Sequence, residues 1–165
     1  MKLGLGGGCH WCTEAVFQMI AGILKVDQGF IQADPPNHGW SEAVVVTFDP
    51  VALPPEILIE IHLRTHASTS RHKMRGKYRS AVYVYDAATG VKVGRILREL
   101  QKQFSEPLVT EVLSLAAFKP SGSQFQNYYL KGPDRPFCKT YIDPKLALLR
   151  REYGRVLKDK VEAAE

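Results

Sequence analysis

The sequence has no long apolar run, and it has only three cysteines among its 165 residues. Its apolar stretches fall far short of the roughly 20 residues that a membrane-spanning helix needs, so we expect no membrane association. Met1 and Lys2 lead into glycines rather than into the apolar core of a secretory signal, which favours a cytoplasmic protein. An odd number of cysteines is typical of reactive thiols in a reducing compartment and argues against a framework of structural disulfides.

A bound metal is also disfavoured. A structural zinc site needs four ligands, and Cys9-x-x-Cys12 supplies only two of them. No second paired motif follows, since the other candidates are single and scattered, namely Cys138, His38, His62, His66 and His72. We therefore predict that the protein binds no metal.

The net charge of +5 comes from 22 basic and 17 acidic residues that are spread along the chain. The densest basic group lies between residues 71 and 79 and carries no signature of a nucleic-acid-binding fold. Such a group is typical of a solvated loop or of a surface that attracts acidic partners. We expect no nucleic-acid partner.

The composition that remains is ordinary for a globular protein, with 45% hydrophobic and 24% charged residues. A chain of 165 residues can bury its own core without the help of metals or disulfides. No internal repeat and no linker divides the sequence, so we expect a single domain over residues 1–165.

Apolar patterning predicts a succession of strands and helices. Strands are expected at 2–5, up to about residue 30, at 42–48, 78–85 and 108–115, and the β-branched run 42–48 is the clearest of them. Helices are expected behind Cys9 at 15–20, after the prolines at 54–55, over 91–104 and over 145–160. This order favours an α+β fold, a two-layer sandwich with a mixed or antiparallel sheet, a ferredoxin-like core and a helical C-terminal tail.

The segment Gly6-Gly7-Gly8-Cys9 joins the first expected strand to the first expected helix. A cysteine at a helix start meets unpaired backbone N–H groups and the positive end of the helix dipole, and both favour the thiolate. The glycines allow a substrate to approach the backbone closely. Cys9 is therefore the candidate nucleophile.

Other interpretations of Cys9 stay open. A single cysteine is often a small buried hydrophobe, and a run of glycines is often only a turn. Cys9-x-x-Cys12 also fits a redox pair that exchanges disulfides, although nothing after Cys12 indicates a parallel sheet with regular alternation of strands and helices.

Glu42 stands where the clearest strand follows a glycine-containing loop. A carboxyl group at such a position can lie in an apolar pocket, where loss of solvation favours its protonated form and makes it a proton donor. A glutamate at a strand end is also often simply solvated. Glu42 therefore becomes a candidate acid only in combination with Cys9.

Four segments, taken in order, resemble the peptide methionine sulfoxide reductases of the A type. Gly8-Cys9-His10-Trp11-Cys12-Thr13-Glu14 is similar to that family's Gly-Cys-Phe-Trp motif. Gly39-Trp40-Ser41-Glu42-Ala43-Val44 is similar to its Gly-His-Ala-Glu-Val-Val segment, and Phe48-Asp49-Pro50 follows as it does there. Tyr78-Arg79-Ser80-Ala81 matches its Tyr-Arg-Ser-Ala strand, and Phe137-Cys138 stands where a Tyr-Cys pair carries a resolving cysteine.

The resemblance implies a reaction. Cys9 would attack the sulfur of an oxidised methionine of the S configuration, while Glu42, helped by the hydroxyl of Tyr78, would protonate the oxygen. Cys9 would become a sulfenic acid, which a second thiol converts into a disulfide. Cys138 is the expected resolving cysteine, because it follows a segment rich in glycine and proline, and Cys12 is the alternative.

The resemblance also implies partners. The substrate would be oxidised methionine in a peptide or protein, or the free amino acid. Trp11 would form the apolar wall that accepts the S-methyl group, with His10 and Trp40 as further substrate-binding residues. No cofactor is expected, because an external dithiol, thioredoxin in this family, would reduce the disulfide.

The sequence departs from the family around these residues. His10 replaces a phenylalanine of the methyl pocket, and Trp40 replaces a histidine beside Glu42. The loop between Gly29 and Gly39 lacks the family's tyrosine, so one of two hydroxyls on the oxygen side is missing. Two alternatives therefore stay open: a thiol–disulfide oxidoreductase that uses the Cys9-x-x-Cys12 motif, and a module that binds oxidised methionine or senses peroxide without turnover.

Overall fold

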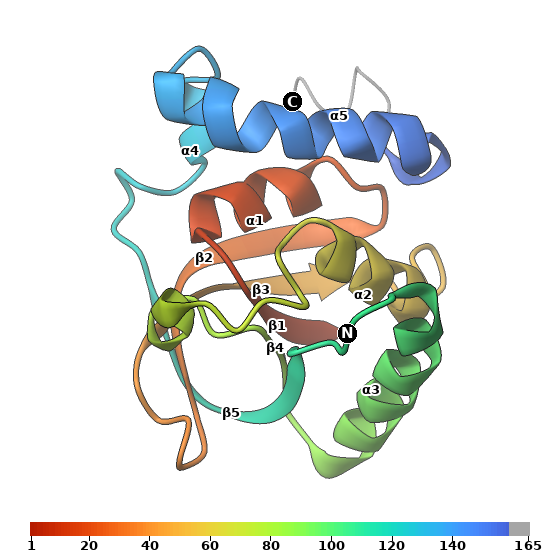
Figure 1. Cartoon of the computed structure of the whole chain (residues 1–165). Coiled ribbons are helices and arrows are strands. Elements are labelled where there is room, and N and C mark those ends of the chain that lie inside the picture. The colour runs from red at the N-terminus through yellow and green to blue at the C-terminus, as the bar shows by residue number, and fades with distance from the viewer. Residues whose placement is uncertain (159–165) are drawn as a thin grey trace.

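The computed structural model describes residues 1–158 and has an α+β fold with one mixed sheet (Figure 1). The strands are β1 (Lys2–Gly6), β2 (Ile23–Ala33), β3 (Ser41–Phe48), β4 (Ala81–Val84) and β5 (Glu111–Pro120). The α-helices are α1 (His10–Gln18), α2 (Pro55–Arg64), α3 (Ala87–Leu100), α4 (Tyr128–Lys131) and α5 (Asp143–Glu152). Short 3₁₀ turns lie at Lys73–Gly76, Gln101–Gln103 and Gly154–Val156, and a π-helix lies at Cys138–Ile142.

The strand pairings close on themselves. Strand β1 pairs antiparallel with both β3 and β4, and β2 pairs antiparallel with β3. Strand β5 pairs antiparallel with the end of β2 and parallel with β4, so the order β1-β3-β2-β5-β4 returns to β1 as a closed barrel. The α+β class and the mixed sheet are confirmed. The two-layer, ferredoxin-like description is not, because β5 joins the two edges that an open two-layer sheet would leave free.

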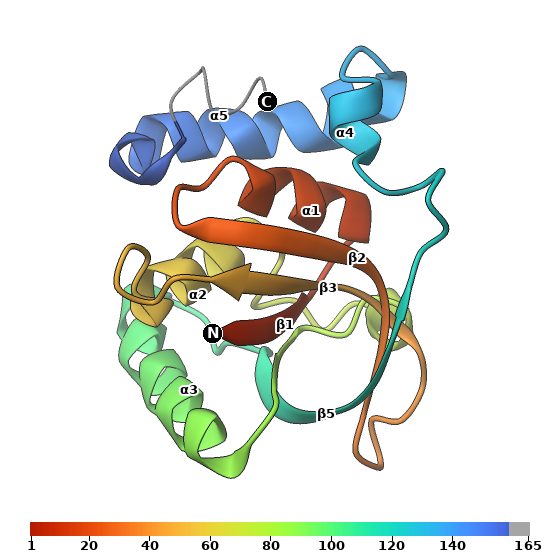
Figure 2. The ribbon, with the colours of Figure 1, turned by 180° about the vertical axis from the view of Figure 1, so that it is seen from behind.

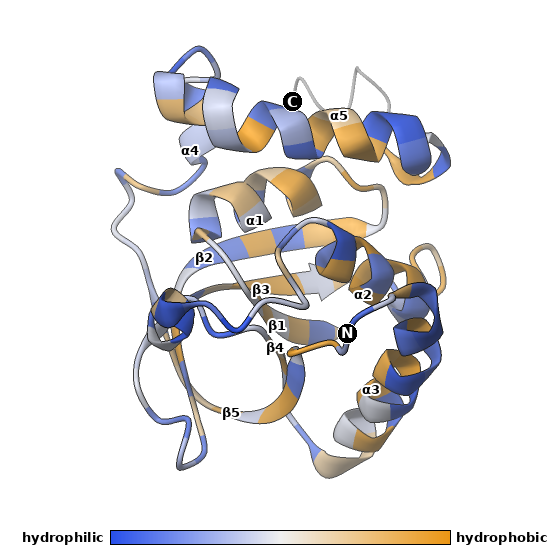
Figure 3. Cartoon of the chain, viewed as in Figure 1, coloured by the Kyte–Doolittle hydropathy of each residue, from blue (hydrophilic) through white to orange (hydrophobic). Residues whose placement is uncertain are grey.

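Both faces of the sheet are buried, and the side chains on the two faces belong to different hydrophobic clusters. In β3, Val44 and Val46 belong to the large cluster that includes residues of the helices, while Val45 belongs to a smaller cluster with Ile31 and Tyr83. This alternation is the two-residue period of a strand. Figure 3 shows apolar colour along the strands and on parts of α2, α3 and α5. Burying one such side chain contributes about 1.5–3 kcal/mol.

The helices form layers over the sheet. Helix α1 lies across β2 and β3, and α5 lies across α1 on the side away from the strands (Figures 1 and 2). Helices α2 and α3 pack beside each other at the other end of the sheet. The N-terminus of α1 therefore lies between the sheet and the C-terminal helices, and the candidate nucleophile is placed there.

The observed boundaries differ from the expected ones for local reasons. Helix α3 begins at Ala87 rather than at residue 91, because the side chain of Asp86 accepts a hydrogen bond from Thr89 N and caps it. Strand β4 is shorter than the expected 78–85, and β5 begins three residues later than expected, at Glu111. The last helix ends at Glu152, and the expected end at residue 160 lies outside the described residues. Within residues 1–158, no helix is both long and apolar enough to span a bilayer.

Candidate active site

Cys9 is the N-cap residue of α1, directly after the glycine turn that follows β1. Its carbonyl accepts hydrogen bonds from Cys12 N at 3.1 Å and Thr13 N at 3.2 Å, which starts the helix, and its side chain is half-buried. The turn packs tightly, because a Cβ on Gly7 would collide with the ring of His66. Packing therefore requires glycine at position 7. This turn sets the position of Cys9 relative to the end of β1.

The surroundings of Cys9 favour its thiolate. A side-chain hydrogen bond from Cys12 is the largest cause that lowers the pKa of Cys9, and the backbone N–H of Trp11 lowers it further. Burial and the charge of Glu42 act in the opposite direction, but the net shift is downward from the usual 9.0. The same hydrogen bond to Cys9, together with burial, raises the pKa of Cys12. One sulfur of the pair is thus a nucleophile and the other keeps its proton.

Cys138 lies in the π-helix before α5 and is fully buried in the large core cluster. Its thiol donates to the Gly132 carbonyl at 3.4 Å, and burial raises its pKa. Its charge is among the groups that raise the pKa of Cys12. Lys145 of α5, which donates to the Thr65 carbonyl, lowers the pKa of Cys12. All three cysteines are free thiols.

Glu42 is the second residue of β3, and only 6% of its surface is exposed. Its Oε1 accepts the backbone N–H of His10 at 3.2 Å and lies 3.3 Å from Nε2 of the His10 ring. Its Oε2 lies 3.6 Å from Nζ of Lys77. The carboxyl group therefore points at the start of α1, close enough for its charge to affect the Cys9 thiol.

His10 is buried, with 6% of its surface exposed. Its Nδ1 lies 2.8 Å from the Gly29 carbonyl, so this nitrogen carries the proton and Nε2 is the one that faces Glu42. The edge of the ring packs against Phe30, with 5.2 Å between ring centroids. The residue that replaces the family's phenylalanine is thus a polar partner of the candidate acid.

Tyr78 is half-buried and stands at the end of the loop that closes over the glycine turn. Arg75 organises this loop: its guanidinium donates to the carbonyls of Gly7 and Tyr78, each at 2.9 Å, and also to those of Ser70 and Ala67. From the sequence, Arg75 belonged to a basic group expected to be solvated. Only its folded position reveals that it ties the loop to the turn before Cys9.

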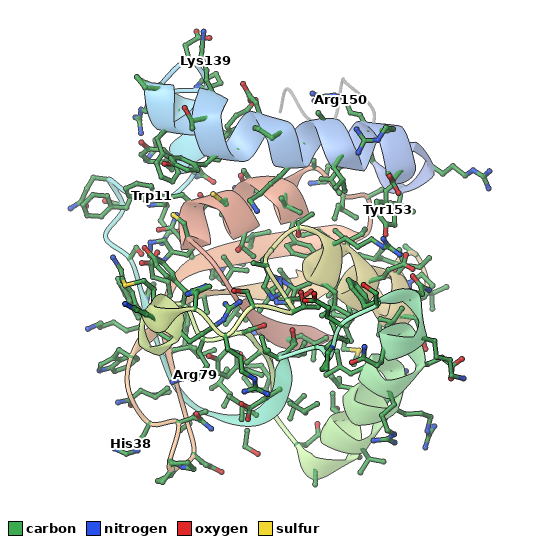
Figure 4. All side chains as sticks on the ribbon, viewed as in Figure 1. Trp11, His38, Arg79, Lys139, Arg150 and Tyr153 are labelled. Atoms are coloured by element: carbon green, nitrogen blue, oxygen red, sulfur yellow. The ribbon has the colours of Figure 1, made fainter. Side chains whose placement is uncertain are left out.

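Trp11 is packed among aromatic residues of the C-terminal segment. Its ring stacks on Tyr128 with 4.0 Å between centroids and 3° between planes, and the edge of Phe137 meets it at 5.4 Å. Figure 4 labels Trp11 at the N-terminal end of α1, beside the chain that leads to α4. Trp11 is thus held by a distant part of the chain, and its role as the wall that accepts a methyl group stays a prediction.

Glu14 holds this arrangement in place, and it was not among the site residues expected from the sequence. Its fully buried carboxyl group accepts the backbone N–H groups of Asn127 at 3.0 Å and Tyr128 at 3.1 Å, and the side-chain amide of Gln28 at 3.0 Å. Burial raises its pKa, while these donors lower it. An acidic residue on the apolar face of an expected helix is the signal that could have indicated a buried anchor.

Trp40 lies two residues before Glu42 and is 42% exposed. Nζ of Lys119 lies 4.8 Å above its ring and 5.7 Å from the ring of Phe30. Of the expected site residues, Cys9, Cys12 and Glu42 lie together at the start of α1, while Trp40 lies at the surface. Within residues 1–158, no group of three or more His, Cys, Asp or Glu side chains is placed to hold a metal ion.

These groups together support one kind of chemistry. An ionised sulfur can attack an electrophilic atom, a buried carboxyl group can manage a proton beside it, and a neighbouring thiol can close a disulfide. The protein is therefore of the class of thiol-dependent oxidoreductases.

Comparison with known proteins gives the family. A family model described as peptide methionine sulfoxide reductase matches residues 1–156. The peptide methionine sulfoxide reductase MsrA of Paenarthrobacter aurescens (strain TC1) is 32% identical over 164 residues, which cover 91% of this chain and 94% of that one. That of Psychrobacter sp. (strain PRwf-1) is 33% identical and covers 93% and 96%. The chain belongs to the peptide methionine sulfoxide reductase family and is an oxidoreductase.

Solved structures agree on the fold. Mxr1 from Saccharomyces cerevisiae in its reduced form superposes with a TM-score of 0.70 at 20% identity, over 86% of this chain and 90% of that one. Mxr1 in complex with Trx2 gives a TM-score of 0.59 at 17% identity, over 78% and 84%. At these identities the likeness concerns the fold alone.

Proposed function

We propose that this protein reduces methionine S-sulfoxide, in peptides or as the free amino acid, with Cys9 as the nucleophile. The observation that carries the proposal is the position of the half-buried Cys9, whose pKa is lowered, beside the buried carboxyl group of Glu42. A sulfoxide needs both groups, because its sulfur accepts the thiolate and its oxygen must gain a proton before it can leave.

The atoms balance as follows. The Cys9 sulfur bonds to the sulfoxide sulfur while Glu42, helped by a hydrogen bond from the Tyr78 hydroxyl, gives one proton to the oxygen. The oxygen then passes to the Cys9 sulfur, and both the S–O bond of the substrate and the bond between the two sulfurs break. Methionine leaves with a reduced sulfur, and Cys9 becomes a sulfenic acid. The stacked rings of Trp11 and Tyr128 would receive the S-methyl group of the substrate.

Cys12 is the thiol that we propose to resolve the sulfenic acid in this conformation, in place of Cys138. Cys12 is the largest influence that lowers the pKa of Cys9, and two residues three apart at a helix start have a Cα separation that suits a disulfide. Cys138 is fully buried and donates to Gly132. Condensation of the sulfenic acid with the Cys12 thiol releases water and forms the disulfide.

An external dithiol then reduces the disulfide, and thioredoxin is the one that we propose. The solved complex of the related Mxr1 with Trx2 supports this choice. Cys9, as the more exposed sulfur of the pair, is the atom that such a dithiol would attack. A cytoplasmic site of action and a single domain over residues 1–165 remain parts of the proposal.

The finer fold description is also a proposal. The succession β1-α1-β2-β3-α2-β4, with the strands in the order β4-β1-β3-β2, supports a ferredoxin-like core to which β5 has been added.

The function is tested with the two separated sulfoxide epimers of a methionine-containing peptide and dithiothreitol as reductant. We expect the S epimer to be consumed and the R epimer to remain, as followed by chromatography of the peptide. Turnover with thioredoxin, its reductase and NADPH should follow the same preference. Equal consumption of both epimers, or of neither, would contradict the proposal.

The resolving thiol is tested by mass mapping after one equivalent of the S epimer, without reductant. We expect a Cys9–Cys12 disulfide with Cys138 free, and the same bond in Cys138→Ser. In Cys12→Ser, the sulfenic acid should persist and be trapped by dimedone. A Cys9–Cys138 bond in the unaltered protein would show instead that the C-terminal segment moves and that Cys138 resolves.

The Cys9-x-x-Cys12 pair, in which the pKa of Cys9 is lowered and that of Cys12 is raised, also favours a second candidate function, general thiol–disulfide exchange. An exchanger would reduce a disulfide such as oxidised glutathione faster than the sulfoxide peptide. The sulfoxide reductase would show the reverse order, because the buried Glu42 has no role in opening a disulfide.

A further inference from the structure

Lys77 is held against the start of β3 by its own backbone. Its carbonyl accepts the N–H of Glu42 at 2.9 Å and the hydroxyl of Ser41 at 3.0 Å. The position of its Cα relative to Glu42 is thus set by two hydrogen bonds rather than by the conformation of a free loop. The side chain starts from a fixed point beside the candidate acid.

The ammonium group of Lys77 lies on the solvent side of that acid. Its Nζ is 3.6 Å from Oε2 of Glu42 and 5.2 Å from the centroid of the Tyr78 ring. The Lys77 side chain is 56% exposed, whereas that of Glu42 is 7% exposed. A charge-assisted hydrogen bond is about 2.7–2.9 Å long, so a gap of 3.6 Å leaves N–H groups of Lys77 uncommitted.

The two oxygens of Glu42 are therefore distinct. Oε1 is occupied by the backbone and ring of His10, while Oε2 faces Lys77. A sulfoxide whose sulfur meets Cys9 and whose oxygen meets Oε2 would bring that oxygen to the ammonium group as well.

We propose that Lys77 is a catalytic residue that donates a hydrogen bond to the sulfoxide oxygen. The inference rests on the proposed function and assigns one more group to the same site. As the Cys9 sulfur bonds to the substrate sulfur, negative charge gathers on the oxygen, and a fixed cation stabilises that charge in the transition state more than in the bound substrate. The proton still comes from Glu42, and Lys77 remains charged throughout.

An ordinary surface ion pair is the competing interpretation of the same contact. Such pairs contribute little to stability, and their loss leaves chemistry unaffected. The contacts of Lys77 extend beyond a single carboxylate, since its Nζ also lies 5.2 Å from the centroid of the Tyr78 ring. Tyr78 first and Glu42 second raise the pKa of Lys77 above the usual 10.5. The ammonium form is therefore the one present at any pH where Cys9 reacts.

The test compares Lys77→Met, Lys77→Arg and a matched control, Lys25→Met. Lys25 is also an exposed lysine paired with a carboxylate, at 3.3 Å from Asp27. One equivalent of a peptide S-sulfoxide is mixed with excess reduced enzyme, and methionine formation is followed by rapid quench. We expect a loss of about 10- to 100-fold in Lys77→Met at saturating enzyme, substantial recovery in Lys77→Arg, and no change in Lys25→Met.

Alkylation of Cys9 by iodoacetamide separates a role at the oxygen from a role at the thiol. We expect Lys77→Met to be alkylated as fast as the unaltered protein at each pH. Unchanged single-turnover rates in Lys77→Met would overturn the inference, and so would a parallel loss of alkylation and reduction. If the unaltered protein fails to reduce either sulfoxide epimer, the proposed function itself has failed, which is a different result.

Discussion

Cys9→Ser is expected to abolish sulfoxide reduction, with a loss of about 10³-fold or more in the formation of methionine. A serine hydroxyl fits the same N-cap position and keeps the helix start, but it is not ionised near neutral pH and cannot hold the transferred oxygen as a sulfenic acid. The measurement is turnover of a peptide S-sulfoxide with dithiothreitol. Circular dichroism should show an unchanged fold, because serine is a favoured N-cap residue.

The pH dependence of Cys9 alkylation provides the control. Since the pKa of Cys9 is lowered, its reaction with iodoacetamide should be half-maximal at a pH below the usual 9.0. The Cys12 hydrogen bond is the largest cause of that shift, so Cys12→Ala should move the midpoint upward. Residual reduction in Cys9→Ser at more than one tenth of the original rate would show that another thiol is the nucleophile.

Local patterns determined much of the fold. The run from Ser41 to Phe48 is β-branched and bounded by turn residues, and it forms a strand over this range. Helix α2 begins at its prolines, because proline is tolerated in a first turn. The Cys9 turn was also predictable, since a glycine run between an apolar strand and an apolar helix leaves few other arrangements. Each of these features depends on residues close together in sequence.

Long-range pairings were the ones that could not be predicted. The barrel closes because β5 reaches both β2 and β4, and no local pattern in Glu111–Pro120 encodes which edges it will meet. The ring of His10 faces Glu42 because Gly29, 19 residues away, accepts its Nδ1 proton. Glu14 reaches backbone groups at residues 127 and 128. A sequence motif names the residue types at a site, but the partner of each side chain depends on tertiary packing.

Glu42→Gln is expected to lower sulfoxide reduction by about 10²- to 10⁴-fold. Glutamine keeps the size of the side chain, and its carbonyl oxygen can still accept the N–H of His10. It cannot give a proton to the departing oxygen. Because Glu42 donates its proton in the transition state and not in the bound substrate, kcat and kcat/KM should fall together. Steady-state turnover of the S epimer with thioredoxin measures both.

The same substitution should act on Cys9 in the opposite direction, and this separates the loss of an acid from damage to the nucleophile. The charge of Glu42 raises the pKa of the Cys9 thiol, so its removal can only increase the fraction of thiolate. We therefore expect Glu42→Gln to be alkylated by iodoacetamide at least as fast as the unaltered protein near neutral pH, while it reduces sulfoxide far more slowly. Slower alkylation together with slower reduction would mean that Glu42 supports the position of α1 through His10 and does not act as the proton donor.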